Sequence, residues 1–230
     1  MNILIIGSGA REHAFAWKIH NSKSHINIYV TNPNAGMLDI AIPLNIEINN
    51  FNLIKESIIE HEISLVLVGP EIRLIMGITD FIYKDKDLDD VKVIGPSKLG
   101  AKLEGSKEFA KNFMNKYNIP TGSYKSFTRG TLNEGVNFIK NNNPPYVLKA
   151  DGPAAGKGVI IVNNEEEAVS SLKDMLINSK FGASSQTVII EEFLSGIEMS
   201  CFVLFDGFNY KILPYAKDYK RIGEGDSGLN

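Results

Sequence analysis

Cysteine is almost absent from this sequence, whose 230 residues include only Cys201. A lone cysteine cannot close an intramolecular disulfide or build a metal site from cysteine ligands. Cys201 lies in an apolar segment, residues 199–204, without the histidine and asparagine pattern of a cysteine protease. We therefore expect a small buried side chain rather than a catalytic nucleophile.

An excess of basic residues and long apolar runs are also missing. Lys and Arg number 24 against 27 Asp and Glu, which gives a net charge of −3. This balance argues against a nucleic-acid partner, which usually meets a basic surface. No apolar stretch approaches the length of a membrane span, and the first residues lack the basic leader of a signal peptide. We expect a cytoplasmic protein with neither a nucleic-acid nor a membrane partner.

Strand and helix signals follow two patterns along the chain. Over residues 1–102, short apolar runs end in turns rich in Gly, Pro or Asn and alternate with helical segments such as 75–84. This rhythm predicts an α/β fold with a doubly wound parallel sheet. Ser97 is the expected cap of a helix that runs to about Tyr117. Residues beyond 123 predict an α+β arrangement with a largely antiparallel sheet, including a strand over 199–205.

The first glycine loop, residues 7–12, follows a strand and opens a helix, so its backbone N–H groups can bind an anion. Two details argue against a dinucleotide: Glu12 takes the third glycine position, and the second strand runs into Thr31-Asn32 rather than an acid. A single phosphate fits better, and Arg11 can add a charge-assisted bond to it. The alternative for residues 11–13 is a solvated first helical turn.

Two more loops, residues 32–36 and 69–71, should follow strand ends at the same edge of the sheet. Open parallel sheets bind ligands at that edge. Glu71 can accept hydrogen bonds there from sugar hydroxyls or an amine. The alternative is a surface acid that follows a turn.

The second glycine loop, residues 149–159, is not a Walker A loop. Gly152 and Gly156 have three residues between them, Gly158 replaces the Ser/Thr, and the apolar residues 159–162 predict a strand instead of a helix. A glycine loop between two strands can fold over a triphosphate, with Lys149 and Lys157 neutralising its charge. The alternative is a flexible hairpin, but Lys149 sits in a strand where an unpaired buried ammonium is costly.

A third segment combines an apolar strand, residues 188–190, with Glu191 and Glu192 and, after a turn, Glu198. The strand end can offer backbone groups to an adenine edge. Glu198 can hold ribose hydroxyls.

Together these segments resemble, in order along the whole chain, the phosphoribosylamine–glycine ligases of the ATP-grasp superfamily. The matching segments are GSGAREHA (7–14), PNAG (33–36), VGPE (68–71), GITD (77–80), LEGSKEF (103–109), KADGPAAGKG (149–158), EEFL (191–194), DYKR (218–221) and GDSGLN (225–230). Departures include Ala10 in place of a loop glycine and Tyr219 in place of a histidine.

The resemblance implies ATP-dependent ligation of glycine to 5-phosphoribosylamine through a glycyl phosphate, a step of purine synthesis. ATP would be bound by Lys107, Lys149, Gly156, Lys157, Gly158, Glu191, Glu192, Leu194 and Glu198. Phosphoribosylamine would be bound by Gly9, Arg11, Glu12, Asn34, Gly36 and Glu71. Asp218, Lys220, Asp226 and Asn230 would lie near the reacting centre. The family uses Mg²⁺ or Mn²⁺, and its metal ligands are expected beyond Asn230. We therefore expect this chain to be a fragment of a longer enzyme. We also expect a monomer.

The expected domains are a Rossmann-like domain (1–102), a connecting helix (103–122), a small ATP-grasp subdomain (123–190) and the incomplete start of a larger one (191–230). Three alternatives stay open. A nucleotide-binding module would bind ATP without turnover. Another ATP-grasp carboxylate–amine ligase would share the Lys149 loop but not residues 11–13 and 69–71. An NAD oxidoreductase would bind NADH.

Overall fold

The computed structural model describes residues 1–22, 24–154, 157–217 and 223–224. The chain forms two compact units, residues 1–192 and residues 193–230, which are described one at a time.

The first unit begins with a five-stranded parallel sheet in the order β3-β2-β1-β4-β5. Its strands are β1 (Asn2–Ile6), β2 (Asn27–Thr31), β3 (Ile42–Leu44), β4 (Leu65–Val68) and β5 (Lys92–Ile94). The strand order grows from β1 to β3 on one side and continues with β4 on the other. The predicted doubly wound sheet is confirmed, and its direction of winding reverses between β1 and β4.

Helices cover both faces of this sheet because successive side chains of a strand point to opposite faces. Ile3 and Ile5 pack with Ala16 of α1 and with Met37. Leu4 and Ile6 pack on the other face, against α2 and α4. A fully buried aliphatic side chain contributes about 2 kcal/mol, so this alternation anchors β1 in both layers. The helical elements are α1 (Ala10–His20), η1 (Ala35–Met37), α2 (Phe51–Glu60), α3 (Glu71–Met76), α4 (Ile78–Lys84) and η2 (Lys86–Leu88).

Two predicted helices are each broken in two. The helix predicted over residues 75–84 is interrupted at Gly77, whose φ of 99° ends α3 in the left-handed conformation that glycine adopts without strain. The helix predicted from Ser97 to Tyr117 consists of α5 (Lys98–Gly105) and α6 (Lys107–Lys116). Ser97 caps α5 as predicted, but Ser106 is extended, with a φ of −143°, and caps α6 by accepting a hydrogen bond from the Phe109 N–H.

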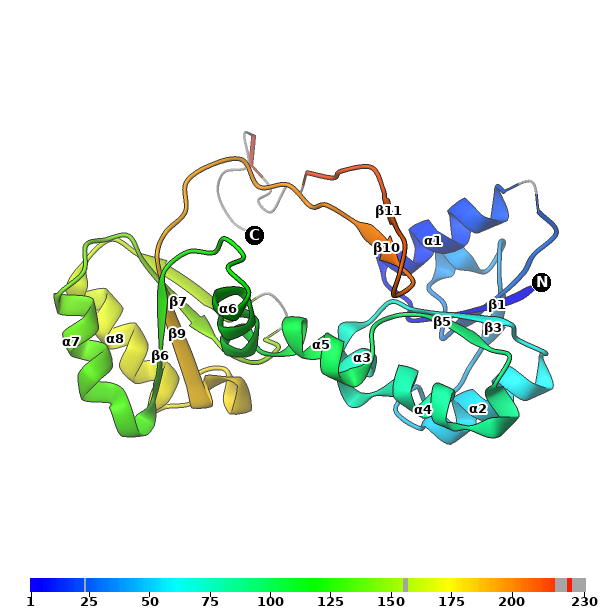
Figure 1. Ribbon diagram of the computed structural model, residues 1–230, viewed down its shortest axis with the longest axis horizontal. Coiled ribbons are helices and arrows are strands. Elements are labelled where there is room, and N and C mark those ends of the chain that lie inside the picture. Colours follow the sequence, from blue (N-terminus) through cyan, green and yellow to red (C-terminus); the bar gives the residue numbers. More distant parts are fainter. Residues whose placement is uncertain (23, 155–156, 218–222, 225–230) are drawn as a thin grey trace. The chain divides into compact units, whose positions relative to one another are not determined.

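A four-stranded antiparallel sheet follows in the first unit, in the order β6-β9-β7-β8. Its strands are β6 (Tyr124–Thr128), β7 (Tyr146–Ala150), β8 (Val159–Val162) and β9 (Thr187–Glu191), accompanied by η3 (Arg129–Thr131), α7 (Leu132–Lys140), α8 (Glu165–Leu176) and η4 (Gly182–Gln186). The α7 and α8 helices cover one face of this sheet (Figure 1). Phe127, Leu148 and Ile190 are buried on that face. The predicted antiparallel α+β arrangement is confirmed.

The second unit contains a hairpin of β10 (Val203–Phe205) and β11 (Tyr210–Ile212). The Asp206 carboxylate holds the turn by accepting hydrogen bonds from the backbone N–H groups of Phe208 and Asn209, at 2.8 and 2.6 Å. These bonds keep the pKa of Asp206 below its usual value, with the Asn209 N–H as the largest cause. The strand predicted over 199–205 is thus shorter than expected, and β11 was not predicted.

Cys201 is exposed, so the prediction of a buried side chain is wrong. Its neighbours Met199 and Phe202 are also exposed, at 58% and 49%. Within the described part of the second unit, no helix covers this apolar segment. A search of the described ranges also finds no helix that is long and apolar enough to cross a membrane.

Candidate functional site

The first candidate site lies where β1 and β4 end, at the point where the winding of the parallel sheet reverses. Ligands of open α/β sheets bind in the crevice at this point. The Gly7 N–H donates to Thr31 Oγ1, which is buried at the end of β2, at 2.9 Å. Gly7 has a φ of 119°, and a Cβ there would lie 2.9 Å from Pro70. Only glycine therefore lets the loop after β1 pass this close to the loop after β4.

The Glu12 side chain connects the same two loops. Its carboxylate accepts a hydrogen bond from the Gly9 N–H at 2.7 Å, in the third position of α1, as in a capping box. A Cβ at Gly69 would lie 2.0 Å from Glu12 Oε1, so the carboxylate fills the space that this glycine leaves. Glu12 is only 5% exposed, so its side chain supports the two loops from the interior and does not face solvent.

Asn34 fastens a third loop to the first. Its side-chain Nδ2 donates to the Ser8 carbonyl at 2.8 Å, and its Oδ1 accepts from the Gly36 N–H at 3.0 Å. The ring of His13 packs on Gly36 so closely that a Cβ there would lie 2.3 Å from His13 Cε1. His13 lies within the motif of residues 7–14, but no role was predicted for it from the sequence.

Arg11 and Glu71 complete this cluster on its open side. The Arg11 guanidinium lies 3.6 Å from the Glu71 carboxylate, and the two side chains are 77% and 45% exposed. An exposed pair of this kind adds little stability, so Arg11 remains available to an anion. All six residues predicted for phosphoribosylamine thus belong to this cluster of loops.

The second candidate site is built on the face of the antiparallel sheet opposite α7 and α8. Glu191 lies opposite Val147, and Lys149 lies opposite Ile189, so Glu191 and Lys149 are diagonal neighbours on one face. Lys149 Nζ contacts Glu191 Oε1, and Lys111 Nζ of α6 lies 2.8 Å from Glu191 Oε2. The buried ammonium predicted to be costly if unpaired is therefore paired.

The pKa of Glu191 reflects two opposing effects. Burial alone would raise the pKa, but the hydrogen bonds from Lys111 and Lys149 outweigh it, and the pKa lies below its usual value. The carboxylate is therefore held ionised between the two ammonium groups.

Lys107 adds a further ammonium group at the start of α6. Its Nζ lies 3.4 Å from the carbonyl oxygens of Asp151 and Gly152. Burial lowers its pKa; the negative charge of Asp151 acts against this, and the positive charge of Lys149 lowers it further. Lys107 and Lys149 are thus close enough to repel each other, an arrangement that an anion between them would relieve.

Asp151 and Ser106 also lie within sequence motifs, but no function was predicted for them. The Asp151 carboxylate accepts from Ser106 Oγ at 3.1 Å and from the Glu108 N–H at 2.8 Å. These bonds attach the first turn of α6 to the end of β7. No local signal could reveal the pairing, because the partners are 45 residues apart.

The second glycine loop connects β7 to β8 as predicted. The Ala150 N–H donates to the Gly158 carbonyl at 2.8 Å, and the Lys157 N–H donates to the Ala154 carbonyl at 2.9 Å. A Cβ at Gly158 would lie 2.7 Å from the Ala154 Cβ, so glycine is required for this closure. The Lys157 side chain is exposed. Gly156 lies outside the described residues.

The other predicted nucleotide residues are divided between the units. Glu192, at the end of the first, accepts hydrogen bonds from the backbone N–H and the Oγ of Ser123, both at 3.1 Å. Leu194, which is 66% exposed, and Glu198 belong to the second unit. The residues predicted for the reacting centre, Asp218, Lys220, Asp226 and Asn230, lie outside the described residues.

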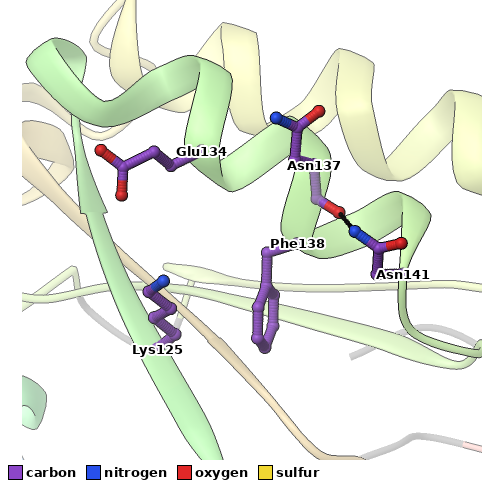
Figure 2. Close-up of a pocket in the computed structure, with 5 residues that line it drawn as sticks. All are labelled: Lys125, Glu134, Asn137, Phe138 and Asn141. Atoms are coloured by element: carbon purple, nitrogen blue, oxygen red, sulfur yellow. Dashed lines mark hydrogen bonds between the residues drawn. The ribbon is translucent and has the colours of Figure 1, made fainter.

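A separate depression of about 310 Å³ lies between β6 and α7 (Figure 2). Its lining residues are Lys125, Glu134, Asn137, Phe138 and Asn141. Lys125 lies opposite Ile190, whose side chain points to the face covered by α7 and α8. This depression is therefore on the other face of the sheet from Lys149 and Glu191 and is not part of the second candidate site.

Comparisons with known proteins agree along the whole chain. Residues 1–104 match the family model of the phosphoribosylglycinamide synthetase N domain, and residues 105–230 match that of its ATP-grasp (A) domain. The phosphoribosylamine–glycine ligase of Halalkalibacterium halodurans is 42% identical over the full chain, which covers 52% of that relative. A bifunctional purine biosynthetic protein of Saccharomyces cerevisiae is 41% identical, and the chain covers 29% of it.

Solved structures show the same relationship. The phosphoribosylamine–glycine ligase of Thermotoga maritima superposes with a TM-score of 0.78 at 33% identity, over all of this chain and 53% of that protein. A biotin carboxylase–β,γ-ATP complex from Campylobacter jejuni has a TM-score of 0.67 at 19% identity, over 92% of this chain and 49% of that one, which shows a shared fold alone.

The chain spans about half the length of the phosphoribosylamine–glycine ligases that it matches. Its parallel sheet, its antiparallel sheet and its match to both family models lead to one conclusion: the chain belongs to the phosphoribosylamine–glycine ligase (phosphoribosylglycinamide synthetase) family of ATP-grasp proteins.

Proposed function

We propose that this protein carries the substrate-binding and nucleotide-binding parts of a phosphoribosylamine–glycine ligase. The observation that supports this most is the pair of nearby lysines, Lys107 and Lys149, beside a glycine loop in a chain that matches both family models. The reaction joins glycine to 5-phosphoribosylamine and converts ATP to ADP and phosphate.

In this proposal the second site holds ATP. Lys107 and Lys149 meet the phosphates, and the loop of Gly156, Lys157 and Gly158 closes over them. The backbone at Glu191 and Glu192 meets the adenine edge, because the Glu191 carboxylate is already bound by two lysines. Leu194 and Glu198 complete the adenine and ribose contacts.

The first site holds phosphoribosylamine. Backbone N–H groups in the first turn of α1 and the guanidinium of Arg11 bind its phosphate beside Gly9, whose own N–H is held by Glu12. Glu71 accepts hydrogen bonds from its ribose or amine. Asn34 and Gly36 set the shape of the loop after β2, and the Glu12 carboxylate holds the loop after β1. A single phosphate suits this loop because Glu12 occupies the space that a third glycine would leave open.

The chemistry proceeds in two displacements. A glycine carboxylate oxygen attacks the γ-phosphorus of ATP, which forms glycyl phosphate and releases ADP. The amine of phosphoribosylamine then attacks the glycyl carbonyl, the bond from carbon to phosphate breaks, and the amine loses a proton. We assign Asp218, Lys220, Asp226 and Asn230 to the surroundings of this centre. The protein contributes positioning, charge neutralisation and exclusion of water.

A divalent cation, Mg²⁺ or Mn²⁺, would neutralise triphosphate charge during phosphoryl transfer. Among the described residues, no group of three or more His, Cys, Asp or Glu side chains is placed to hold one. We also propose a division into domains 1–102, 103–122, 123–190 and 191–230, a cytoplasmic location and a monomeric state.

The decisive experiment measures ADP release by the protein with glycine and phosphoribosylamine supplied together and singly. We expect sustained release only when both are present, because glycine alone supports no more than the first displacement. Nucleotide binding without ADP release would identify a binding module instead. Release with a different carboxylate and amine would identify another ATP-grasp ligase.

A further inference from the structure

Lys111 has no role in the nucleotide site proposed above, yet its side chain is largely buried beside that site. The side chain is 12% exposed. Its Nζ lies 2.8 Å from Glu191 Oε2, donates to Thr121 Oγ1 at 2.9 Å and donates to the Gly122 carbonyl at 3.1 Å. An ammonium group has three N–H donors, so all of those of Lys111 are used within the protein. Lys111 is therefore not itself a ligand for phosphate.

Lys149 shares the same carboxylate but is in a different situation. It is more exposed, at 28%, and Glu191 is its only ion-pair partner among the described residues. It also interacts electrostatically with Lys107. Of the two lysines on Glu191, Lys149 is the more exposed, and it is the one that the proposed function assigns to the phosphates.

The charges of Glu191, Lys111 and Lys149 give a reason for a second lysine on this carboxylate. A carboxylate with one lysine forms a neutral pair, so Glu191 alone would cancel the charge of Lys149. With Lys111 on its second oxygen, the group of Glu191, Lys111 and Lys149 carries one net positive charge. The side chains are mostly buried, where screening by water is weak and the balance of charges is felt strongly.

We propose that Lys111 is a positioning residue of the nucleotide site: it holds and neutralises Glu191, so that Lys149 keeps both its place and its positive charge for the phosphates of ATP. The inference rests on the proposed function, because it requires a nucleotide at this site. Lys111 also lies 5.5 Å from the centre of the Tyr124 ring, so a role confined to attaching α6 to the sheet is the alternative.

The test compares Lys111→Met with Lys111→Arg in the full-length protein. Calorimetry measures the binding of a non-hydrolysable ATP analogue and of adenosine, which has no phosphate. We expect Lys111→Met to bind the analogue about tenfold more weakly, because the group of Glu191, Lys111 and Lys149 loses its net positive charge, and to bind adenosine as before. Lys111→Arg keeps the charge and should retain most of the affinity. Lys116→Met, a lysine change later in the same helix, is the matched control.

A double variant separates charge from structure. In Lys111→Met the three-residue group becomes neutral, whereas Lys111→Met with Glu191→Gln has one net positive charge again, on Lys149. We therefore expect the double variant to recover most of the affinity for the ATP analogue. A purely structural Lys111 predicts no recovery.

Three results would overturn the inference. The first is equal weakening of the analogue and adenosine, the second is no weakening at all, and the third is a double variant as weak as Lys111→Met. If the unaltered protein binds neither compound, the proposed function fails as well. If it binds the analogue normally and only the Lys111 result disagrees, the proposed function stands and this inference alone is rejected.

Discussion

Lys149 connects the two proposals about the second site, since it is at once a proposed phosphate ligand and a partner of Glu191. In Lys149→Met we expect the affinity for an ATP analogue to fall at least about tenfold, because a charge-assisted contact is lost. Phosphoribosylamine binding should persist, because its predicted residues lie on the parallel sheet. Calorimetry with each ligand checks both statements. Equal loss of both would point to misfolding.

Asn34 offers a matching test of the first site. In Asn34→Asp the donor to the Ser8 carbonyl is lost and a negative charge is placed beside a predicted phosphate. We expect the KM for phosphoribosylamine to rise about tenfold and the KM for ATP to stay unchanged. Asn141→Asp is the control, because Asn141 donates a similar bond to the Asn137 carbonyl at the end of α7, beside the antiparallel sheet. An equal rise in that control would contradict the role given to Asn34.

Single residues also show what the sequence could and could not predict. The strand position of Lys149 indicated that it needs a partner, but the partner became known only from the register of β7 and β9. Lys111 and Asp151 were missed for the same reason, since their contacts join distant segments. Glu12 was predicted as a substrate ligand from the motif, whereas its buried carboxylate holds Gly9.

Among the elements, the start of α6 is the most informative. Ser106 caps the helix and also bonds to Asp151, so it links α6, which carries Lys107, to the end of β7. We expect Ser106→Ala to lower the free energy of unfolding by about 1 kcal/mol, as for other N-caps, and also to weaken nucleotide binding. Thermal unfolding and calorimetry measure the two effects.

Ser97→Ala is the control for this prediction. Ser97 caps α5 through the Gly100 N–H but is not bonded to Asp151. It should therefore cost similar stability while leaving nucleotide affinity unchanged. Equal weakening of nucleotide binding in both variants would show that the link to Asp151 does not matter.

The elements were predicted well where the pattern is local and poorly where it is not. Short apolar runs and the turn residues between them identified both sheets. The break at Ser106 was missed, because Phe109 and Phe113 continue the helical spacing beyond α5 and a partner far along the chain stabilises the break. The β3 and β11 strands were missed because Pro43 in β3 argues against a strand and all three residues of β11 are exposed, so no buried face marks it.

At the scale of the whole molecule, the two sheets of the first unit have separate hydrophobic cores. Each core supports one candidate site at its edge or on its open face. This separation is why we expect variants of Lys149 and of Asn34 to affect one ligand each. The family match over residues 1–104 and 105–230 follows the same division between the sheets.

The stability of the whole chain should depend on pH through Glu191. Its pKa is lower in the folded state than in the unfolded chain, because the bonds from Lys111 and Lys149 outweigh the effect of burial. Between those two pKa values the unfolded state binds more protons, so the free energy of unfolding rises with pH. The stabilisation is thus complete above the unfolded value, about 4.5, and is lost as the pH falls through the folded value.

Glu191→Gln should remove this part of the acid dependence. It should also destabilise the protein at neutral pH by about 3 kcal/mol, because two lysines lose the charge between them. Urea unfolding at a series of acidic and neutral pH values measures both effects. Glu192→Gln, which removes a carboxylate one residue later, is the control. If Glu191→Gln retained the full slope of the unaltered protein in acid, the cluster would not be the source of that stability, and the charge balance inferred for Lys111 would lose its physical basis.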